Sequence, residues 1–214
     1  MKKVILVLVL LLLVTGCTTK NIENEDINDV IVSAIEDSNH DFTESYNGFK
    51  IRIPQGFEIV GKVENNIRIL NDEDVYYLYI DIIGRYYKKD VEYEEKSNVF
   101  LSRKINYNDK NGYIEINEKD DKYFIKAEYN NAKIEALVNK NNINTGVYNI
   151  IKMLSSVEYN DLIINTMIGE NALTYKEEEF NLFESKQEEN FFMDYIDEYD
   201  EEEELSIKDE DIIK

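Results

Sequence analysis

The chain has 214 residues and a formal charge of −21, because 45 aspartates and glutamates outnumber 24 lysines and arginines. Such a charge repels phosphate backbones, which argues against nucleic acid as a partner. A single cysteine cannot form a disulfide within the chain, so stability has to come from core packing. The length predicts one domain with additions rather than two full domains.

The N-terminal segment has the layout of an export signal. A basic start with two lysines precedes the apolar run Val4–Val14. This run is far shorter than the about 20 residues that an α-helix needs to cross a bilayer. A basic start, a short apolar core and small residues at its end are instead typical of a cleavable secretory signal, here residues 1–16.

Val14-Thr15-Gly16-Cys17 follows at the end of this signal. These four residues resemble the lipobox of bacterial lipoproteins, in which an aliphatic residue, a small residue, Gly or Ala, and Cys stand in this order. The resemblance implies cleavage between Gly16 and Cys17 and a diacylglyceryl group on the Cys17 thiol. Two acyl chains give lasting attachment, so we expect a protein anchored to the cell membrane on the extracytoplasmic side. The alternative is a free cysteine buried in an N-terminal helix.

Residues 17–44 are expected to form a lipid-anchored tether that contains one short helix. Apolar residues recur at spacings of three and four over Ile27–Ile35, which predicts a helix with one apolar face. This face docks either on the folded domain or on a partner.

From residue 46 the apolar period changes to two, which predicts strands. The first strand covers residues 49–53, and the turn Pro54-Gln55-Gly56 is expected to join it in a hairpin to the next strand. Val75–Ile83 is expected to be one long strand, with Tyr77 and Tyr79 on the side opposite its aliphatic residues.

Further strands are predicted over residues 99–138, joined by short polar turns that make successive strands antiparallel neighbours. Asn144 or Thr145 is a candidate N-cap of an apolar helix that ends near Val157. Residues 45–160 thus predict an α+β domain, an antiparallel β-sheet meander covered on one face by a C-terminal helix.

Two segments of this domain resemble the PsbP-like and Mog1-like family. They are the strand that ends in proline, Gly48–Pro54, and the apolar helix that continues into a Ser-containing segment, Ile150–Val157. The resemblance implies a PsbP/Mog1-like fold and a non-enzymatic binding or assembly role, and it assigns no functional residue. Phe57 stands where the family often has tryptophan.

Residues 161–199 are predicted to be an acidic helical extension, and residues 200–214 a disordered acidic tail. From Lys176 to the end there are 17 acidic and 4 basic residues. Aromatic and aliphatic residues at helical spacing predict an apolar face that lies in a groove of this domain or of a partner. These candidate partner-binding residues are Phe191, Phe192, Tyr195, Ile196 and Tyr199.

We predict no catalytic residue, no metal site and no cofactor. His40 is the only histidine and lies in a polar stretch, and a lipidated Cys17 cannot bind zinc. Tyr77 and Tyr79 are candidates for an aromatic ligand platform, although tyrosine also simply favours strands.

These patterns together predict a membrane-anchored binding or assembly factor of the bacterial envelope, with a basic or cationic partner. One alternative is a small-ligand-binding lipoprotein associated with a transporter. Another is an envelope hydrolase, which would need a cluster of polar residues that sequence alone does not display.

Overall fold

The computed structural model describes residues 22–37, 41–169 and 175–182. The elements in chain order are η1 Ile22–Asn24, α2 Ile27–Glu36, β1 Glu44–Tyr46, β2 Phe49–Ile51, β3 Glu58–Val63, β4 Asn66–Asn71, β5 Asp74–Ile80, α3 Ile82–Tyr87, β6 Leu101–Tyr107, β7 Lys110–Lys119, β8 Lys122–Tyr129, β9 Ala132–Asn139, η2 Lys140–Asn142, α4 Ile143–Ser155, β10 Glu158–Tyr159 and α5 Asp161–Gly169.

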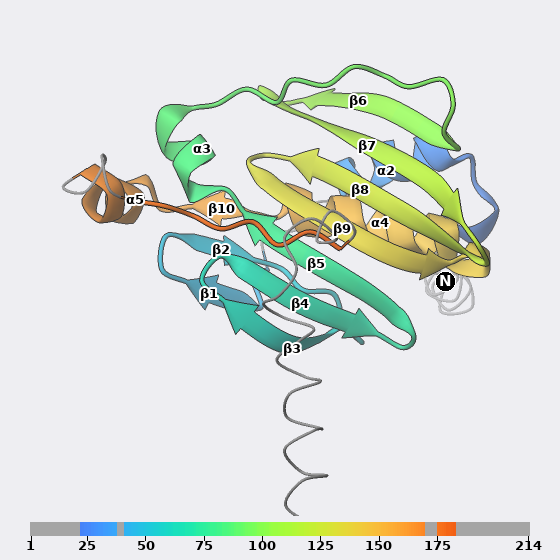
Figure 1. Cartoon of the computed structure of the whole chain (residues 1–214), viewed down its shortest axis with the longest axis horizontal. Coiled ribbons are helices and arrows are strands. Elements are labelled where there is room, and N and C mark those ends of the chain that lie inside the picture. Colours follow the sequence, from blue (N-terminus) through green and yellow to red (C-terminus); the bar gives the residue numbers. More distant parts are fainter. Residues whose placement is uncertain (1–21, 38–40, 170–174, 183–214) are drawn as a thin grey trace, which may run out of the picture.

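Seven strands form an antiparallel sheet with the order β3-β4-β5-β9-β8-β7-β6. Strands β3 to β5 are one meander and strands β6 to β9 are a second. Between them the chain passes through α3 to the far edge of the sheet and returns, so that β9 pairs with β5 (Figure 1). The fold is therefore α+β with antiparallel sheets, as the sequence predicts.

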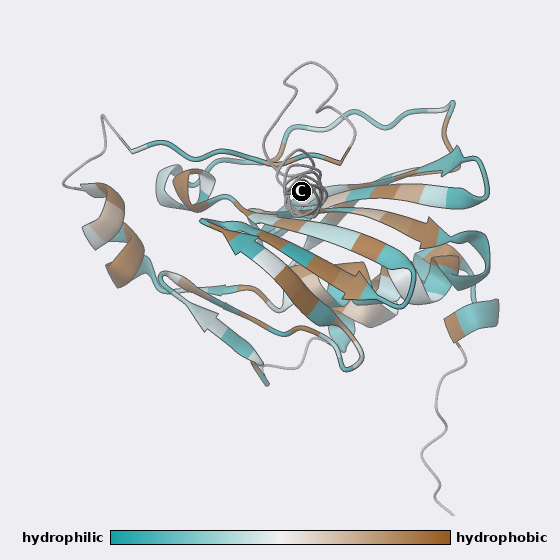
Figure 2. Cartoon of the chain, turned by 60° about the horizontal axis from the view of Figure 1, so that its bottom comes forward, coloured by the Kyte–Doolittle hydropathy of each residue, from teal (hydrophilic) through white to brown (hydrophobic). Residues whose placement is uncertain are grey.

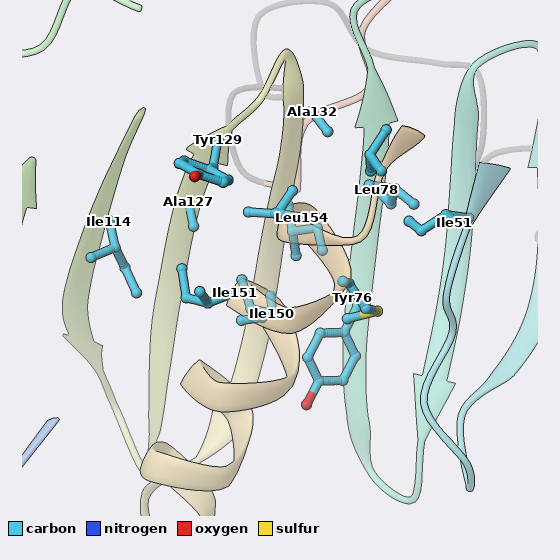
Figure 3. Close-up of a cluster of buried hydrophobic side chains, with 14 of the residues drawn as sticks. Ile51, Tyr76, Leu78, Ile114, Ala127, Tyr129, Ala132, Ile150, Ile151 and Leu154 are labelled. Atoms are coloured by element: carbon cyan, nitrogen blue, oxygen red, sulfur yellow. The ribbon is translucent and has the colours of Figure 1, made fainter. Parts of the chain in front are cut away.

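Helix α4 packs on one face of this sheet, which we call the inner face. Its apolar stripe is fully buried against the strands and includes Ile150, Ile151 and Leu154 (Figure 3). Apolar and polar residues alternate along the strands (Figure 2), so one face is apolar and the opposite, outer face is polar. The predicted helix on one sheet face is confirmed.

Helix α2 packs beside α4 and completes the helical layer behind the sheet (Figure 1). Val30, Ile31 and Ala34 on its apolar face are at most 2% exposed. At its C-terminal end Asp37 accepts hydrogen bonds from the Lys152 ammonium and the Tyr148 hydroxyl of α4. The apolar face of this helix therefore docks on the domain, so the domain core begins within the predicted tether.

Asn144 lies in the first turn of α4 rather than at its N-cap, which is Asn142. Its side-chain amide donates to the backbone oxygens of Ile22 and Glu25, at 3.0 and 2.8 Å. This side chain thus ties the start of the described chain to α4.

Strand β2 does not form the predicted hairpin with β3. It pairs antiparallel with β1 on one side and β10 on the other, in a separate three-stranded sheet. Gly56, at a φ of +88°, turns the chain away from β2 after Pro54. The alternation identified the strand correctly but could not identify its partner, because β10 comes much later in the chain.

One local prediction also needs correction. Strand β5 ends at Ile80 rather than Ile83, because the Asp81 side chain accepts the Gly84 N–H and caps α3. Gly112 lies inside β7, and an added Cβ there would be 2.0 Å from the backbone oxygen of Glu128. Gly112 therefore permits close approach of two strands.

Adjacent residues of α2 provide a test of its docking. Ile31 is 2% exposed and Val32 is 42% exposed. We expect Ile31→Ala to lower the free energy of unfolding by about 2–4 kcal/mol, because it removes buried methyl groups and leaves a cavity. Val32→Ala, the control, should change it by less than about 0.5 kcal/mol. Urea unfolding followed by circular dichroism measures both, and equal effects would contradict docking of this face.

Candidate functional site

The outer face of the seven-stranded sheet carries two cross-strand rows of polar and aromatic side chains. One row consists of Ser102, Glu115, Lys126, Glu135, Tyr77 and Arg68, and the next consists of Lys104, Tyr113, Glu128, Lys133, Tyr79 and Asn66. Opposite charges stand directly across the strands at Glu115 and Lys126, and again at Lys126 and Glu135, which stabilises the pairing. The outer face is thus a charged surface whose glutamates and lysines alternate.

Two segments cover parts of this face. Residues 175–182, which we call the strap, cross it in extended form in front of β5 and β9 (Figure 1). The segment over residues 91–96, which we call the 91–96 loop, covers β7. The sequence predicted a helical extension over residues 161–199; α5 is helical, whereas the strap is not.

Glu177 holds the first part of the strap. Its carboxylate accepts hydrogen bonds from the Tyr79 hydroxyl at 3.0 Å, the Asn65 amide at 2.7 Å and the Ile83 backbone N–H at 3.1 Å. Burial raises the pKa of Glu177 above its ordinary value of 4.5, although these hydrogen bonds act in the opposite direction. The carboxylate thus joins the strap to β5 and to the start of α3.

The strap backbone is also bound by side chains of the sheet. The Asn66 amide donates to the Glu178 backbone oxygen at 2.7 Å, and its oxygen accepts the Phe180 N–H at 3.0 Å. Further along, the Leu182 N–H donates to the Glu135 carboxylate at 2.7 Å. Asn66 and Glu135 are 7% and 3% exposed, so these contacts satisfy groups that would otherwise be costly to bury.

Lys133 is the buried cation of the outer face, at 8% exposure. Its ammonium lies 2.8 Å from the Glu135 carboxylate and also contacts Glu179 and the Asn181 side chain of the strap. Burial alone would lower the pKa of Lys133, but the two carboxylates outweigh burial and raise it. Lys133 therefore remains charged and links the strap to β9.

The 91–96 loop is held on the sheet by Tyr93. Its ring stacks on Tyr113 with the centroids 4.0 Å apart and the planes 3° from parallel. Its hydroxyl contacts the Ser102 hydroxyl at 2.7 Å and donates to Glu115 at 2.9 Å. Burial raises the pKa of Tyr93, so this hydroxyl keeps its proton at neutral pH.

Lys96 fixes the other end of this loop. Its ammonium pairs with Glu115 at 2.8 Å, and its backbone N–H donates to the Ser102 hydroxyl. Burial would raise the pKa of Glu115, but hydrogen bonds from Lys96, Asn117 and Tyr93 outweigh this effect and lower it. Glu115 is therefore a fixed, ionised carboxylate between the loop and the sheet.

A pocket of about 420 Å³ lies between the 91–96 loop and strands β7, β8 and β9. Aromatic side chains from the loop and the sheet line it, namely Tyr93, Tyr113 and Phe124. Charged side chains line the rest, namely Glu92, Glu94, Lys96, Glu115, Lys126 and Glu135. Its volume lies in the range of small-molecule sites, so we treat this pocket as the candidate functional site.

The predicted ligand-platform residues lie on the outer face of the sheet, as their alternation with aliphatic residues predicts. Tyr79 is 9% exposed beneath the strap, and its hydroxyl donates a hydrogen bond to the Glu177 carboxylate. Tyr77 lies beside Phe180 of the strap and under the Arg68 guanidinium, 5.8 Å from its ring centroid. A ligand would therefore have to displace the strap to reach Tyr79, and a platform role of these tyrosines remains a prediction.

Several sequence predictions lie outside the described residues. They concern Cys17, Gly16, His40 and, in the predicted helical extension, Phe191, Phe192, Tyr195, Ile196 and Tyr199. Within the described part of the chain, no group of three or more His, Cys, Asp or Glu side chains is arranged to hold a metal ion.

The pocket was not predicted from the sequence. The 91–96 loop belongs to a charged stretch without a clear period, so its pattern predicts no contact with the sheet. A usable signal is the spacing Glu92-Tyr93-Glu94, which places one aromatic residue between two charges in a segment too polar to form a core. The partner of that aromatic residue, Tyr113, follows only from the strand order.

Comparison with known proteins bears on the N-terminus. Residues 1–18 match the model of the prokaryotic membrane lipoprotein lipid attachment site. The chain is thus marked as a membrane-anchored lipoprotein, with Cys17 as the residue for lipid attachment. No helix within the described residues is long and apolar enough to cross a membrane. No curated protein matches the chain.

Replacement of Lys133 tests the charge network under the strap. We expect Lys133→Met to lower the free energy of unfolding by about 3 kcal/mol, because it leaves the buried Glu135 carboxylate without its nearest cation. Lys104→Met, an exposed lysine of the same cross-strand row, is the matched control. The double variant Lys133→Met/Glu135→Gln should recover part of the loss. A loss no larger than that of the control would contradict the network.

The raised pKa of Glu177 predicts a pH dependence. The folded state keeps this proton to higher pH than the unfolded state, so its contribution to stability falls as pH rises from about 4.5 through the raised value. Wild type should therefore lose stability relative to Glu177→Gln between pH 4 and pH 7. Urea unfolding across this range measures the difference, with Glu178→Gln at an exposed neighbouring position as control. A difference that is constant with pH would contradict the prediction.

Proposed function

We propose that this lipoprotein is a non-enzymatic binding or assembly factor of the bacterial envelope, held on the extracytoplasmic side of the membrane and directed at a basic or cationic partner. The observation that carries the proposal is the pocket on the outer face, where the carboxylates of Glu92 and Glu94 have no ion-pair partner among the described residues. Two carboxylates without counterions attract cations.

The charge of the C-terminal residues supports the same class of partner. Residues 183–214 contain 14 acidic and 3 basic residues. The strap ends at Leu182, whose N–H is bound to Glu135 at the pocket. The acidic stretch therefore follows directly in sequence on a residue that is bound at the pocket, which supports one basic partner for both.

The resemblance to the PsbP-like and Mog1-like family supports a binding role rather than catalysis. The segments that carry it, Gly48–Pro54 and Ile150–Val157, contact each other, since the Arg52 N–H donates to the Ser156 hydroxyl at 3.0 Å. We propose a PsbP/Mog1-like domain on this basis. The family consists mostly of binding and assembly factors.

The volume of the pocket favours a second candidate function. At about 420 Å³ it has room for a small molecule. The protein would then be a ligand-binding lipoprotein associated with a transporter.

Capture of a partner from envelope extract tests the first function. The bait is the mature chain without lipid, residues 18–214, beside a bait that ends at residue 182 and keeps the strap. We expect the full bait to capture a basic protein after cross-linking and the shortened bait to lose most of it, because the shortened bait lacks 14 acidic residues.

A third bait, Phe191→Ala/Phe192→Ala, tests whether capture depends on the aromatic residues of residues 183–214 or on their charge. It has the same charge as the full bait, so retained capture would assign the contact to charge, whereas loss would assign it to the aromatic residues. Capture of no basic protein by the full bait would contradict the first function.

A further inference from the structure

The pocket beside the 91–96 loop is a preformed cavity. The loop that forms one wall is fixed to the sheet by the Tyr93–Tyr113 stack and by the Lys96–Glu115 ion pair. The opposite wall consists of residues within strands β8 and β9. Because its walls are held by contacts with the sheet, binding of a ligand loses little conformational entropy in ordering them.

The charges that line the pocket are unequal. Four glutamates stand against two lysines, and both lysines have carboxylate partners within the pocket. Lys96 lies 2.8 Å from Glu115, and Lys126 lies 3.8 Å from Glu135. Glu92 and Glu94 remain exposed on the loop, so the pocket presents a net negative charge to an entering group.

The aromatic residues of the pocket indicate a second property of the ligand, namely an apolar part beside its charge. Tyr93, Tyr113 and Phe124 line the same cavity. Aromatic faces attract ammonium and guanidinium groups as well as aliphatic chains. Carboxylates beside aromatic rings therefore suit a cation on an apolar stem better than a bare metal ion or a neutral apolar molecule.

We propose that this pocket binds an organic cation, a primary ammonium or a guanidinium group on an aliphatic stem. This inference rests on the proposed function and names the group that the pocket recognises. The cation comes either from a lysine or arginine side chain of the partner or from a free amine, and both sources offer the same chemistry. The carboxylates of Glu92 and Glu94 bind the charged end, and the rings contact the stem.

Titration of the mature chain, residues 18–214, with defined probes tests the proposal. The probes are acetyl-Gly-Arg-Gly-amide, acetyl-Gly-Lys-Gly-amide, pentylamine, and acetyl-Gly-citrulline-Gly-amide as the neutral analogue of the arginine peptide. Calorimetry gives the affinities, and backbone amide shifts in NMR spectra locate the site at Tyr93, Phe124 and Lys126. We expect the cationic probes to bind at least tenfold more tightly than the citrulline peptide, and less tightly as salt increases.

Matched variants test whether a cation binds at the pocket or is attracted by the overall negative charge of the chain. Glu92→Gln/Glu94→Gln should weaken binding of the cations about fivefold, since each exposed charge contributes modestly. Glu58→Gln/Glu64→Gln makes the same change in charge at exposed positions of the opposite sheet edge and should leave binding unchanged. Lys126→Gln should strengthen binding, because it removes a positive charge from the pocket.

The outcomes distinguish this inference from the proposed function. Tighter binding of the peptides than of pentylamine assigns the cation to a protein side chain, and the reverse assigns it to a free amine. Equal binding of the citrulline peptide, no effect of Glu92→Gln/Glu94→Gln, or weaker cation binding in Lys126→Gln would each overturn the inference. If Glu92→Gln/Glu94→Gln captures the envelope partner as well as wild type while no probe binds, the pocket inference fails, and the proposed function then rests on the acidic residues 183–214 alone.

Discussion

The packing of α4 on the inner face of the sheet is the contact on which the other parts of the structure depend. Its buried stripe supplies the centre of the core (Figure 3), and α2 lies beside it. The chain leaves α4 directly into β10, which pairs with β2, and α5 follows. Further along the chain, the strap crosses the outer face. The inner layer is thus built on α4, whereas the strap is held on the outer face by its own contacts with the sheet.

Much of this arrangement follows from local patterns in the sequence. Period-two alternation identified the strands because one face of each is apolar and buried, and the three- and four-residue spacing identified α2 and α4 for the same reason. Asn108 and Asn130 mark hairpin turns where the chain adopts positive φ, as their residue type suggests. Partners distant in sequence could not be predicted, and β2 shows why: its alternation is equally compatible with β3 and with β10.

The candidate site could not be predicted from these sequence patterns, and the reason is physical. A strand pattern shows that residues such as Glu135 and Lys133 point away from the core, and it predicts exposure for them. Their burial depends on the strap and the 91–96 loop, which are irregular and polar and have no periodicity that reports a contact. The sequence therefore predicted an outward Tyr79 correctly and could not predict the carboxylate of Glu177 that covers its hydroxyl.

The docking of α2 also limits where the domain can lie. Four residues, 18–21, lie between the lipid-attachment residue Cys17 and the start of η1 at Ile22, and the five residue steps from Cys17 to Ile22 span at most about 18 Å. Since η1 is held to α4 by Asn144, the end of the domain that carries the start of α4 stays within this distance of the membrane surface. A lipid anchor on a segment this short confines the domain to the membrane surface and the layer next to it. Confinement raises the effective concentration of any molecule held in the same layer, so a weak contact made there is favoured over the same contact in free solution.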